Sequence, residues 1–372
     1  MAVRPSPSLV VTAPHKTSAW PLALATICLL VYASLYPFSD WRDQGISPFR
    51  FLTAPWPKYW TGFDVATNIA GYMPLGFLLA LSALRSGRVT WAVTVAVLSA
   101  GLLSLCMETL QSYLPSRVPS NVDLGLNILG AWMGGQSAWA LEKLGWIDRW
   151  SRFRANWFVP NARGGLVLLA LWPLTLLFPA AVPFGLGQVL ERVEDGLASL
   201  LQNTPFLEWL PIRDIELQPL VPSMELVCVM LGVLIPCLLG FGIIRGALRR
   251  AVFVFLVFAV GLGSSALSAT LSYGPEHAWA WFGLPVQIGV IAAWICVILL
   301  LWVPRRASGA MMLLALGIYL SLVNQVPTSP YFAQTLSTWE QGRFIRFHGL
   351  AQWLGWIWSM SCCSFGGLIR KN

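Results

Sequence analysis

Long apolar runs, repeated along the whole chain, limit its possible folds more than any other feature. A run of about 20 mostly apolar residues can cross a hydrocarbon layer roughly 30 Å thick as a helix, and a helix satisfies its own backbone hydrogen bonds in lipid. The composition agrees, because 56% of the residues are apolar and only 11% are charged. The sequence therefore predicts an all-α protein, a polytopic bundle of transmembrane helices.

The apolar runs predict about ten spans, with boundaries that hold to within a few residues. If the N-terminus is placed in the cytoplasm, most of the 24 Lys and Arg residues fall in cytoplasmic segments, as the positive-inside rule requires. Both termini are then cytoplasmic, and the net charge of +8 reflects membrane orientation rather than binding to nucleic acid. The predicted spans are residues 19–38, 66–84, 90–110, 122–141, 165–183, 222–244, 251–271, 279–302, 308–324 and 347–366.

The distribution of polar segments predicts how the chain is divided. A cytoplasmic N-terminal tail, residues 1–18, precedes a four-span unit at residues 19–141. A basic cytoplasmic linker, residues 142–164, leads to a second membrane unit of about six spans at residues 165–372. The second unit contains an amphipathic segment near residues 186–217, which we expect to lie on the outer leaflet.

A regular set of polar residues interrupts the apolar sequence between Asp64 and Gly135. A carboxylate at the centre of a bilayer-spanning helix costs about 2.5–3.5 kcal/mol, so such residues usually serve a site or a structural partner. Residues three or four apart share a helix face, and the predicted topology brings these polar faces to the outer ends of three consecutive spans. The candidate ligand-binding residues are Asp64, Asn68, Glu108, Gln111, Arg117, Asp123 and Asn127.

Arg117 falls in the short turn between two of these spans and can reach toward Glu108 or Asp123. Two interpretations are equally open: an outward-facing cluster that recognises an envelope molecule, with Arg117 binding an anion, or a structural network of ion pairs. Asp64 also suits the start of a helix, where its charge is favourable. For Asn68, Gln111 and Asn127, hydrogen bonding between helices is the simpler interpretation.

Small residues and a proline in the same region predict close helix packing. Pro74 and Gly76 lie within the second span, where proline removes a backbone hydrogen bond and glycine permits close approach. Gly130 and Gly134 in the fourth span form a small-xxx-small pair. We expect these four residues to have structural roles.

Neither a metal nor a cofactor site is predicted. The three histidines lie in separate regions, and the seven cysteines lie mostly within apolar runs, where they serve as small packing residues. The sequence contains no glycine-rich phosphate loop and no nucleophile elbow.

Taken together, the polar and small residues form one pattern across three consecutive predicted spans. It reads Asp64-x3-Asn68-x5-Pro74-Leu75-Gly76-Phe77, then Ser104-x3-Glu108-x2-Gln111, then Arg117, and finally Asn121-x-Asp123-x3-Asn127-x2-Gly130-x3-Gly134. This joint pattern, over residues 60–141, resembles the VanZ-like family of bacterial multi-pass membrane proteins, named for a protein associated with teicoplanin resistance. Asn121 departs from the acidic or small polar residue expected near its position. The resemblance implies a cell-envelope protein of the bacterial plasma (inner) membrane.

Two function hypotheses from different classes follow. In the first, a non-enzymatic membrane protein binds a cell-wall or lipid-linked envelope precursor through the outer polar cluster, in contact with membrane lipids. In the second, a membrane enzyme acts on an envelope glycolipid, with Glu108 or Asp123 as acid or base and Arg117 stabilising negative charge. Transport is less favoured, because the inner halves of these spans are apolar. The oligomeric state is left open.

Overall fold

The chain folds into two compact units, Met1–Arg152 (unit 1) and Phe153–Asn372 (unit 2). All of the described regular elements are helical, which confirms the all-α prediction; one isolated β-bridge joins Phe158 and Ile244. Most of the predicted tail at residues 1–18 lies outside the described residues, and so does most of the segment between the last two predicted spans, residues 325–346. The computed structural model describes residues 18–36, 38–56, 61–177, 180–209, 217–327 and 348–371.

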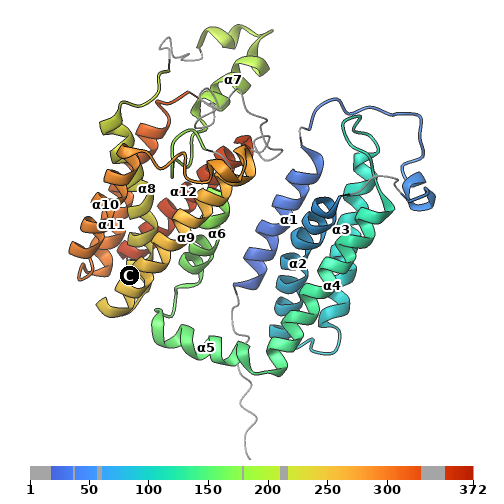
Figure 1. Ribbon diagram of the computed structural model, residues 1–372, viewed down its shortest axis with the longest axis horizontal. Coiled ribbons are helices and arrows are strands. Elements are labelled where there is room, and N and C mark those ends of the chain that lie inside the picture. Colours follow the sequence, from blue (N-terminus) through green and yellow to red (C-terminus); the bar gives the residue numbers. More distant parts are fainter. Residues whose placement is uncertain are drawn as a thin grey trace, which may run out of the picture. The chain divides into compact units, whose positions relative to one another are not determined.

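Unit 1 has a helix at each of its four predicted spans, and Figure 1 shows these four helices side by side. A further helix, α5, lies within the range predicted as a linker, and the boundary between the units falls inside it. Asp148 in its first turn and Arg154 in its last turn both suit the helix dipole. The elements are α1 (Ala19–Leu35), the 3-10 helix η1 (Arg50–Thr53), α2 (Gly62–Arg85), α3 (Ala92–Gln111), α4 (Asn121–Lys143) and α5 (Trp146–Trp157).

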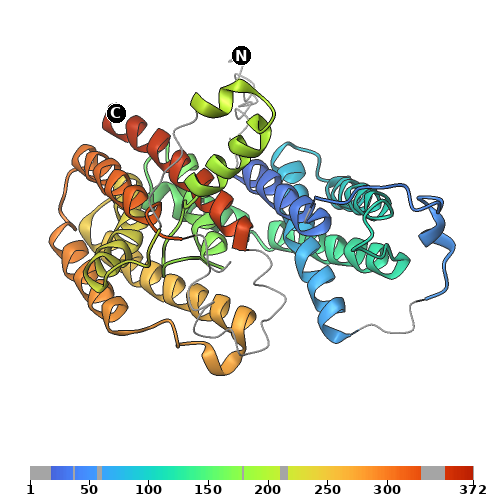
Figure 2. The ribbon, with the colours of Figure 1, turned by 90° about the horizontal axis from the view of Figure 1, so that it is seen from above.

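Unit 2 is built around one buried helix, α8. In the most apolar 18-residue window of α8, 83% of the residues are buried, and Figure 2 shows other helices of the unit on several sides of it. A helix again occupies each of the six predicted spans. The elements are α6 (Arg163–Leu176), α7 (Leu190–Leu201), η2 (Pro205–Trp209), α8 (Pro222–Ile243), α9 (Ala247–Tyr273), η3 (Pro275–His277), α10 (Leu284–Leu299), α11 (Arg305–Val323) and α12 (His348–Lys371).

Among the described residues, five helices are long and apolar enough to cross a membrane, namely α2, α3, α8, α9 and α11. Three further helices, α1, α6 and α10, are apolar but shorter. The helix α4 does not belong to either group, because its polar residues and glycines lower its hydropathy. Helices thus stand where ten spans are expected, while ten crossings with both termini in the cytoplasm stay a prediction.

Glycines bring α2 and α4 into backbone contact. A Cβ atom added at Gly76, Gly130 or Gly134 would come within 3.0 Å of a carbonyl oxygen of the opposite helix. Pro74 lies inside α2, next to Met73, whose carbonyl oxygen faces Gly134. This close approach holds the polar residues at the starts of the two helices near each other.

A buried loop without helical structure enters the core of unit 2. Residues 181–189 are all buried, and the loop includes Phe184 with φ of 57°. The hydroxyl of Tyr319 donates to the Phe184 carbonyl oxygen and accepts from the Leu186 N–H, and the Asn324 Oδ1 accepts a hydrogen bond from the Val189 N–H at the end of the loop. Of the segment predicted as amphipathic near 186–217, residues 186–189 are therefore core, α7 contains no buried residue, and residues 210–216 lie outside the description.

Candidate functional site

The polar residues of unit 1 gather at one end of its helices, where α2 and α4 begin and α1 and α3 end (Figure 1). Two hydrogen bonds link α2, α3 and α4 there. The Asn68 Nδ2 of α2 donates to the Asp123 Oδ1 of α4 over 2.9 Å. The backbone N–H of Ser120, the N-cap of α4, donates to the Glu108 Oε2 of α3 over 2.8 Å. Residues far apart in the sequence thus form one cluster.

The start of α2 is fixed by a capping box. The Thr61 side chain accepts a hydrogen bond from the Asp64 backbone N–H over 3.2 Å, and the Asp64 Oδ2 accepts one from the Thr61 N–H over 3.1 Å. Asp64 therefore stabilises the helix start as its third residue, and Thr61 is the N-cap. The Asp64 carboxylate still lies close enough to repel that of Asp123.

Glu108 is the most unusual residue of the cluster. Its side chain is only 4% exposed, although it belongs to one of the apolar helices. No ion pair involves Glu108 among the described residues, and another carboxylate, Asp123, lies close enough to repel its charge. A buried carboxylate normally has a cationic or hydrogen-bonding partner, and here the one bond from Ser120 serves a single oxygen. The other oxygen, Oε1, accepts no hydrogen bond from the described residues.

Arg117 and Gln111 are directed to α1 instead. The Nη2 of Arg117 donates to the carbonyl oxygens of Ala33 and Tyr36, each over 3.0 Å. The Nε2 of Gln111 donates to the carbonyl oxygen of Ser34 over 3.0 Å. In the described part of the chain, no ion pair joins Arg117 to Glu108 or Asp123. The sequence suggested that Arg117 reaches toward these carboxylates. In the structure its Nη2 donates to the end of α1 instead, because the last carbonyls of a helix need donors.

A second polar layer lies one helical turn deeper. The Nδ2 of Asn127 donates to the Ser104 Oγ over 2.9 Å, and both residues are buried. The Asn127 Oδ1 and the Tyr72 hydroxyl are also buried, and neither has a hydrogen-bond partner among the described residues. The site predicted from the sequence does not include Tyr72 or Ser104. Spacing could have identified them, because Tyr72 follows Asn68 by four residues and Ser104 precedes Glu108 by four.

The cluster is suited to accepting hydrogen bonds rather than to metal binding or nucleophilic attack. It offers three carboxylates, those of Asp64, Glu108 and Asp123, and its one guanidinium donates to backbone carbonyls. Across the described residues, no group of three His, Cys, Asp or Glu side chains could hold a metal ion. Such a site favours ligand groups that donate hydrogen bonds, such as hydroxyl and amine groups.

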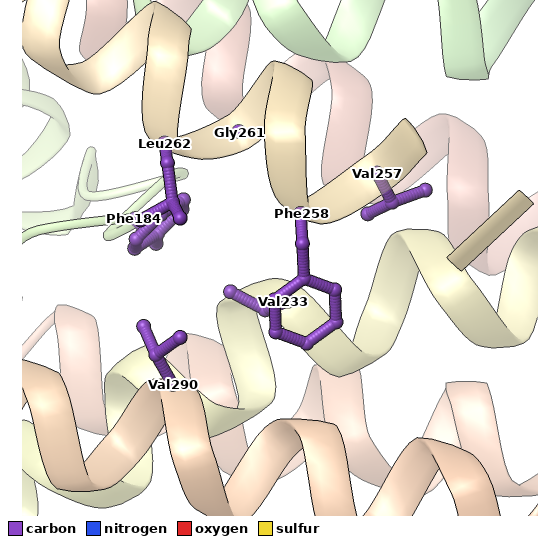
Figure 3. Close-up of a pocket in the computed structure, with 7 residues that line it drawn as sticks. All are labelled: Phe184, Val233, Val257, Phe258, Gly261, Leu262 and Val290. Carbon is purple, nitrogen blue, oxygen red and sulfur yellow. The ribbon is translucent and has the colours of Figure 1, made fainter. Parts of the chain in front are cut away.

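One hollow within the described residues of unit 2 contains no comparable chemistry. Figure 3 shows a gap between α8, α9 and α10 beside the buried loop, and all of its lining is apolar. It is too narrow to hold a water molecule. The lining residues are Phe184, Val233, Val257, Phe258, Gly261, Leu262 and Val290.

Comparison with known proteins agrees with the residue pattern of unit 1. No curated protein and no solved structure matches the chain. A family model described as VanZ/LLP1 matches residues 17–141, a span that begins earlier than residue 60 and so includes α1, which Gln111 and Arg117 contact. Residues 17–141 of this membrane protein thus match the VanZ/LLP1 family, in agreement with the resemblance of their motifs.

Proposed function

We propose that the VanZ-like unit binds a cell-wall or lipid-linked component of the bacterial envelope through the polar end of α2, α3 and α4. The observation that carries the proposal is the burial of Glu108 beside Asp123 without an ion pair among the described residues. A carboxylate held in this way is costly, so a bound ligand that donates hydrogen bonds to it would offset the cost. The family match supports the envelope context.

The chemistry of the cluster indicates which part of the ligand it contacts. Acceptor groups dominate, with Glu108 and Asp123 in the outer layer and the Asn127 Oδ1 deeper. Hydroxyl groups of a sugar or an amine of a peptide are the matching donors in an envelope precursor. Arg117 then acts as a positioning residue that holds α1 against the cluster, instead of binding an anion. Changed access of a glycopeptide antibiotic to this precursor would follow from such binding.

A titration with a defined precursor tests this function. The purified full chain, as wild type, Glu108→Gln and Asp123→Asn, is titrated with a polyprenyl-diphosphate-linked sugar-peptide, and bound ligand is measured by native mass spectrometry. Losing a charged hydrogen bond costs about 1.5–3 kcal/mol, so each variant should bind roughly tenfold more weakly or worse. Asp43→Asn, in an exposed loop of the same unit, is the matched control and should bind like the wild type.

Equal binding by the wild type and both carboxylate variants would contradict the proposal. The same samples separate binding from catalysis. If the wild type converts the precursor and Glu108→Gln binds it without converting it, the enzyme hypothesis replaces simple binding, with Glu108 as the acid or base.

A further inference from the structure

Several helix ends converge at one end of unit 2, the end where α6, α9 and α11 begin (Figure 1). Phe158, shortly before α6, pairs with Ile244 after α8, and Arg249 of α9 donates to the Asn156 carbonyl oxygen. A Cβ atom at Gly242 would touch the side chain of Ile369 near the end of α12. We call this region the basic end of unit 2.

The basic end carries arginines where helices ordinarily favour acids. The first turns of α6, α9 and α11 contain no Asp or Glu, and the positive end of a helix dipole disfavours added cations. Moreover, no Asp or Glu occurs in residues 153–190, 226–275 or 277–339. The arginines in these first turns are Arg163, Arg249, Arg250, Arg305 and Arg306.

Backbone carbonyl oxygens accept hydrogen bonds from two of these arginines, Arg250 and Arg305. The Nη1 of Arg250 donates to the carbonyl oxygens of Leu301 and Val303 over 2.9 and 2.7 Å, and its Nη2 donates to that of Phe241 over 2.8 Å. The Nε of Arg305 donates to the next carbonyl, that of Gly242, over 2.9 Å. Arg250 and Arg305 therefore lie side by side at the end of α8 and repel each other.

The remaining donors have no partner among the described residues. The Arg250 Nε is buried without a hydrogen bond, in a side chain that is only 7% exposed. The terminal nitrogens of Arg305 form no hydrogen bond or ion pair with described groups, and the same holds for the exposed Arg306. Carbonyl dipoles carry only partial charges, so the described residues of this end carry a positive charge that no described acid compensates and that attracts an anion.

Apolar surface borders these arginines and indicates which anion. Leu248 is 81% exposed next to Arg249, and Trp302 is 73% exposed shortly before Arg305. A ligand that fits both surfaces has a phosphate and hydrocarbon chains, and basic pockets between membrane helices bind such headgroups. We propose that the basic end of unit 2 binds the phosphate of an anionic phospholipid through Arg305 and Arg306. The planar guanidinium forks suit phosphate oxygens.

Lipid titration of the full chain in detergent tests this proposal. The probes are phosphatidylglycerol, phosphatidylcholine and inorganic phosphate, and the readouts are bound lipid by native mass spectrometry and the shift in Tm. The wild type should retain phosphatidylglycerol over phosphatidylcholine. Removing two phosphate-facing charges in Arg305→Gln/Arg306→Gln should weaken that binding by about tenfold or more. Arg42→Gln/Arg50→Gln removes the same charge from exposed positions of unit 1 and should bind as the wild type does.

The single variant Arg306→Gln distinguishes a loss of lipid binding from a folding defect, because the Arg306 side chain forms no hydrogen bond with described residues. It should fold normally and lose part of the lipid binding. Equal phosphatidylglycerol binding by the wild type and the double variant would overturn the proposal. Stabilisation by inorganic phosphate equal to that by phosphatidylglycerol would overturn the assignment to a lipid. The site is independent of the proposed function of unit 1, so Glu108→Gln should leave it unchanged.

Discussion

Arg117 illustrates how a charged residue can serve a membrane protein by donating hydrogen bonds to the end of a helix. The last carbonyl groups of any helix have no donor within that helix. At the end of α1, two of these carbonyls, those of Ala33 and Tyr36, accept hydrogen bonds from the Arg117 guanidinium. The same interaction fixes the turn between α3 and α4 against α1, so one side chain stabilises a helix end and positions the polar cluster.

Replacing Arg117 should therefore destabilise the unit. Loss of hydrogen bonds from a charged donor should lower the free energy of unfolding of Arg117→Ala by about 1.5–3 kcal/mol, measured by denaturation in detergent. Arg117→Lys should recover part of the loss. The control is Arg88→Ala, an exposed residue whose side chain has no hydrogen bond to the described residues. If Arg117→Ala is as stable as this control, the positioning role is wrong.

Spacing along the helices predicted that Asn68, Glu108 and Asp123 would meet at one end of the unit, and in the structure hydrogen bonds connect their helices there. The direction of Arg117 could not be predicted, because it depends on where α1 packs, more than 80 residues earlier in the chain. The ligand-binding role of these residues stays a prediction.

The pairing of α2 with α4 depends on small residues rather than on apolarity. The backbone contacts at Gly76, Gly130 and Gly134 replace the side-chain packing that larger residues would provide, as is common between membrane helices. Such packing tolerates the polar groups of α4 because van der Waals contact does not require hydrophobic side chains. The helix that supplies Asp123 and Asn127 to the polar cluster is thus held by its glycines.

A single methyl group at this contact should be costly. In Gly134→Ala, the new Cβ atom would clash with the Met73 carbonyl oxygen, and overpacking of this kind costs about 1–3 kcal/mol. Gly125→Ala, in the same helix, has nothing within 4 Å of the added Cβ atom and should be neutral or slightly stabilising. Thermal unfolding of both variants in one detergent measures the difference. Equal midpoints for the two variants would show that the contact at Gly134 is not tight.

Sequence patterns were sufficient for the long helices but not for the irregular elements between them. Apolar runs of sufficient length placed a helix at every expected span, since helix formation in lipid is dictated by length and hydropathy. The buried loop at residues 181–189 was not predicted, because its backbone is satisfied by distant side chains, those of Tyr319 and Asn324. No local pattern announces that kind of tertiary support.

At the scale of the whole molecule, charge and hydropathy together determine how the chain should cross the membrane. The turn at Ser86 and the segment at Arg245 belong to predicted cytoplasmic segments, whereas Ser116 and Glu276 belong to predicted outer ones. The helix α3 separates Ser86 from Ser116 in unit 1, and α9 separates Arg245 from Glu276 in unit 2. Both helices are long enough to span a bilayer. The ten-span prediction requires that they lie on opposite sides.

Labelling of single cysteines tests this topology in intact cells. The four positions, all exposed, are changed one at a time to Cys in a background that lacks the seven native cysteines. A membrane-impermeant maleimide should label Ser116→Cys and Glu276→Cys directly, and should label Ser86→Cys and Arg245→Cys only after permeabilisation, because Lys and Arg segments stay in the cytoplasm. The opposite pattern at all four positions would mean that the protein has the opposite orientation in the membrane, with the same number of spans. If one unit gave the expected pattern and the other unit the opposite pattern, the chain would have to cross the membrane an odd number of times between Ser86 and Arg245.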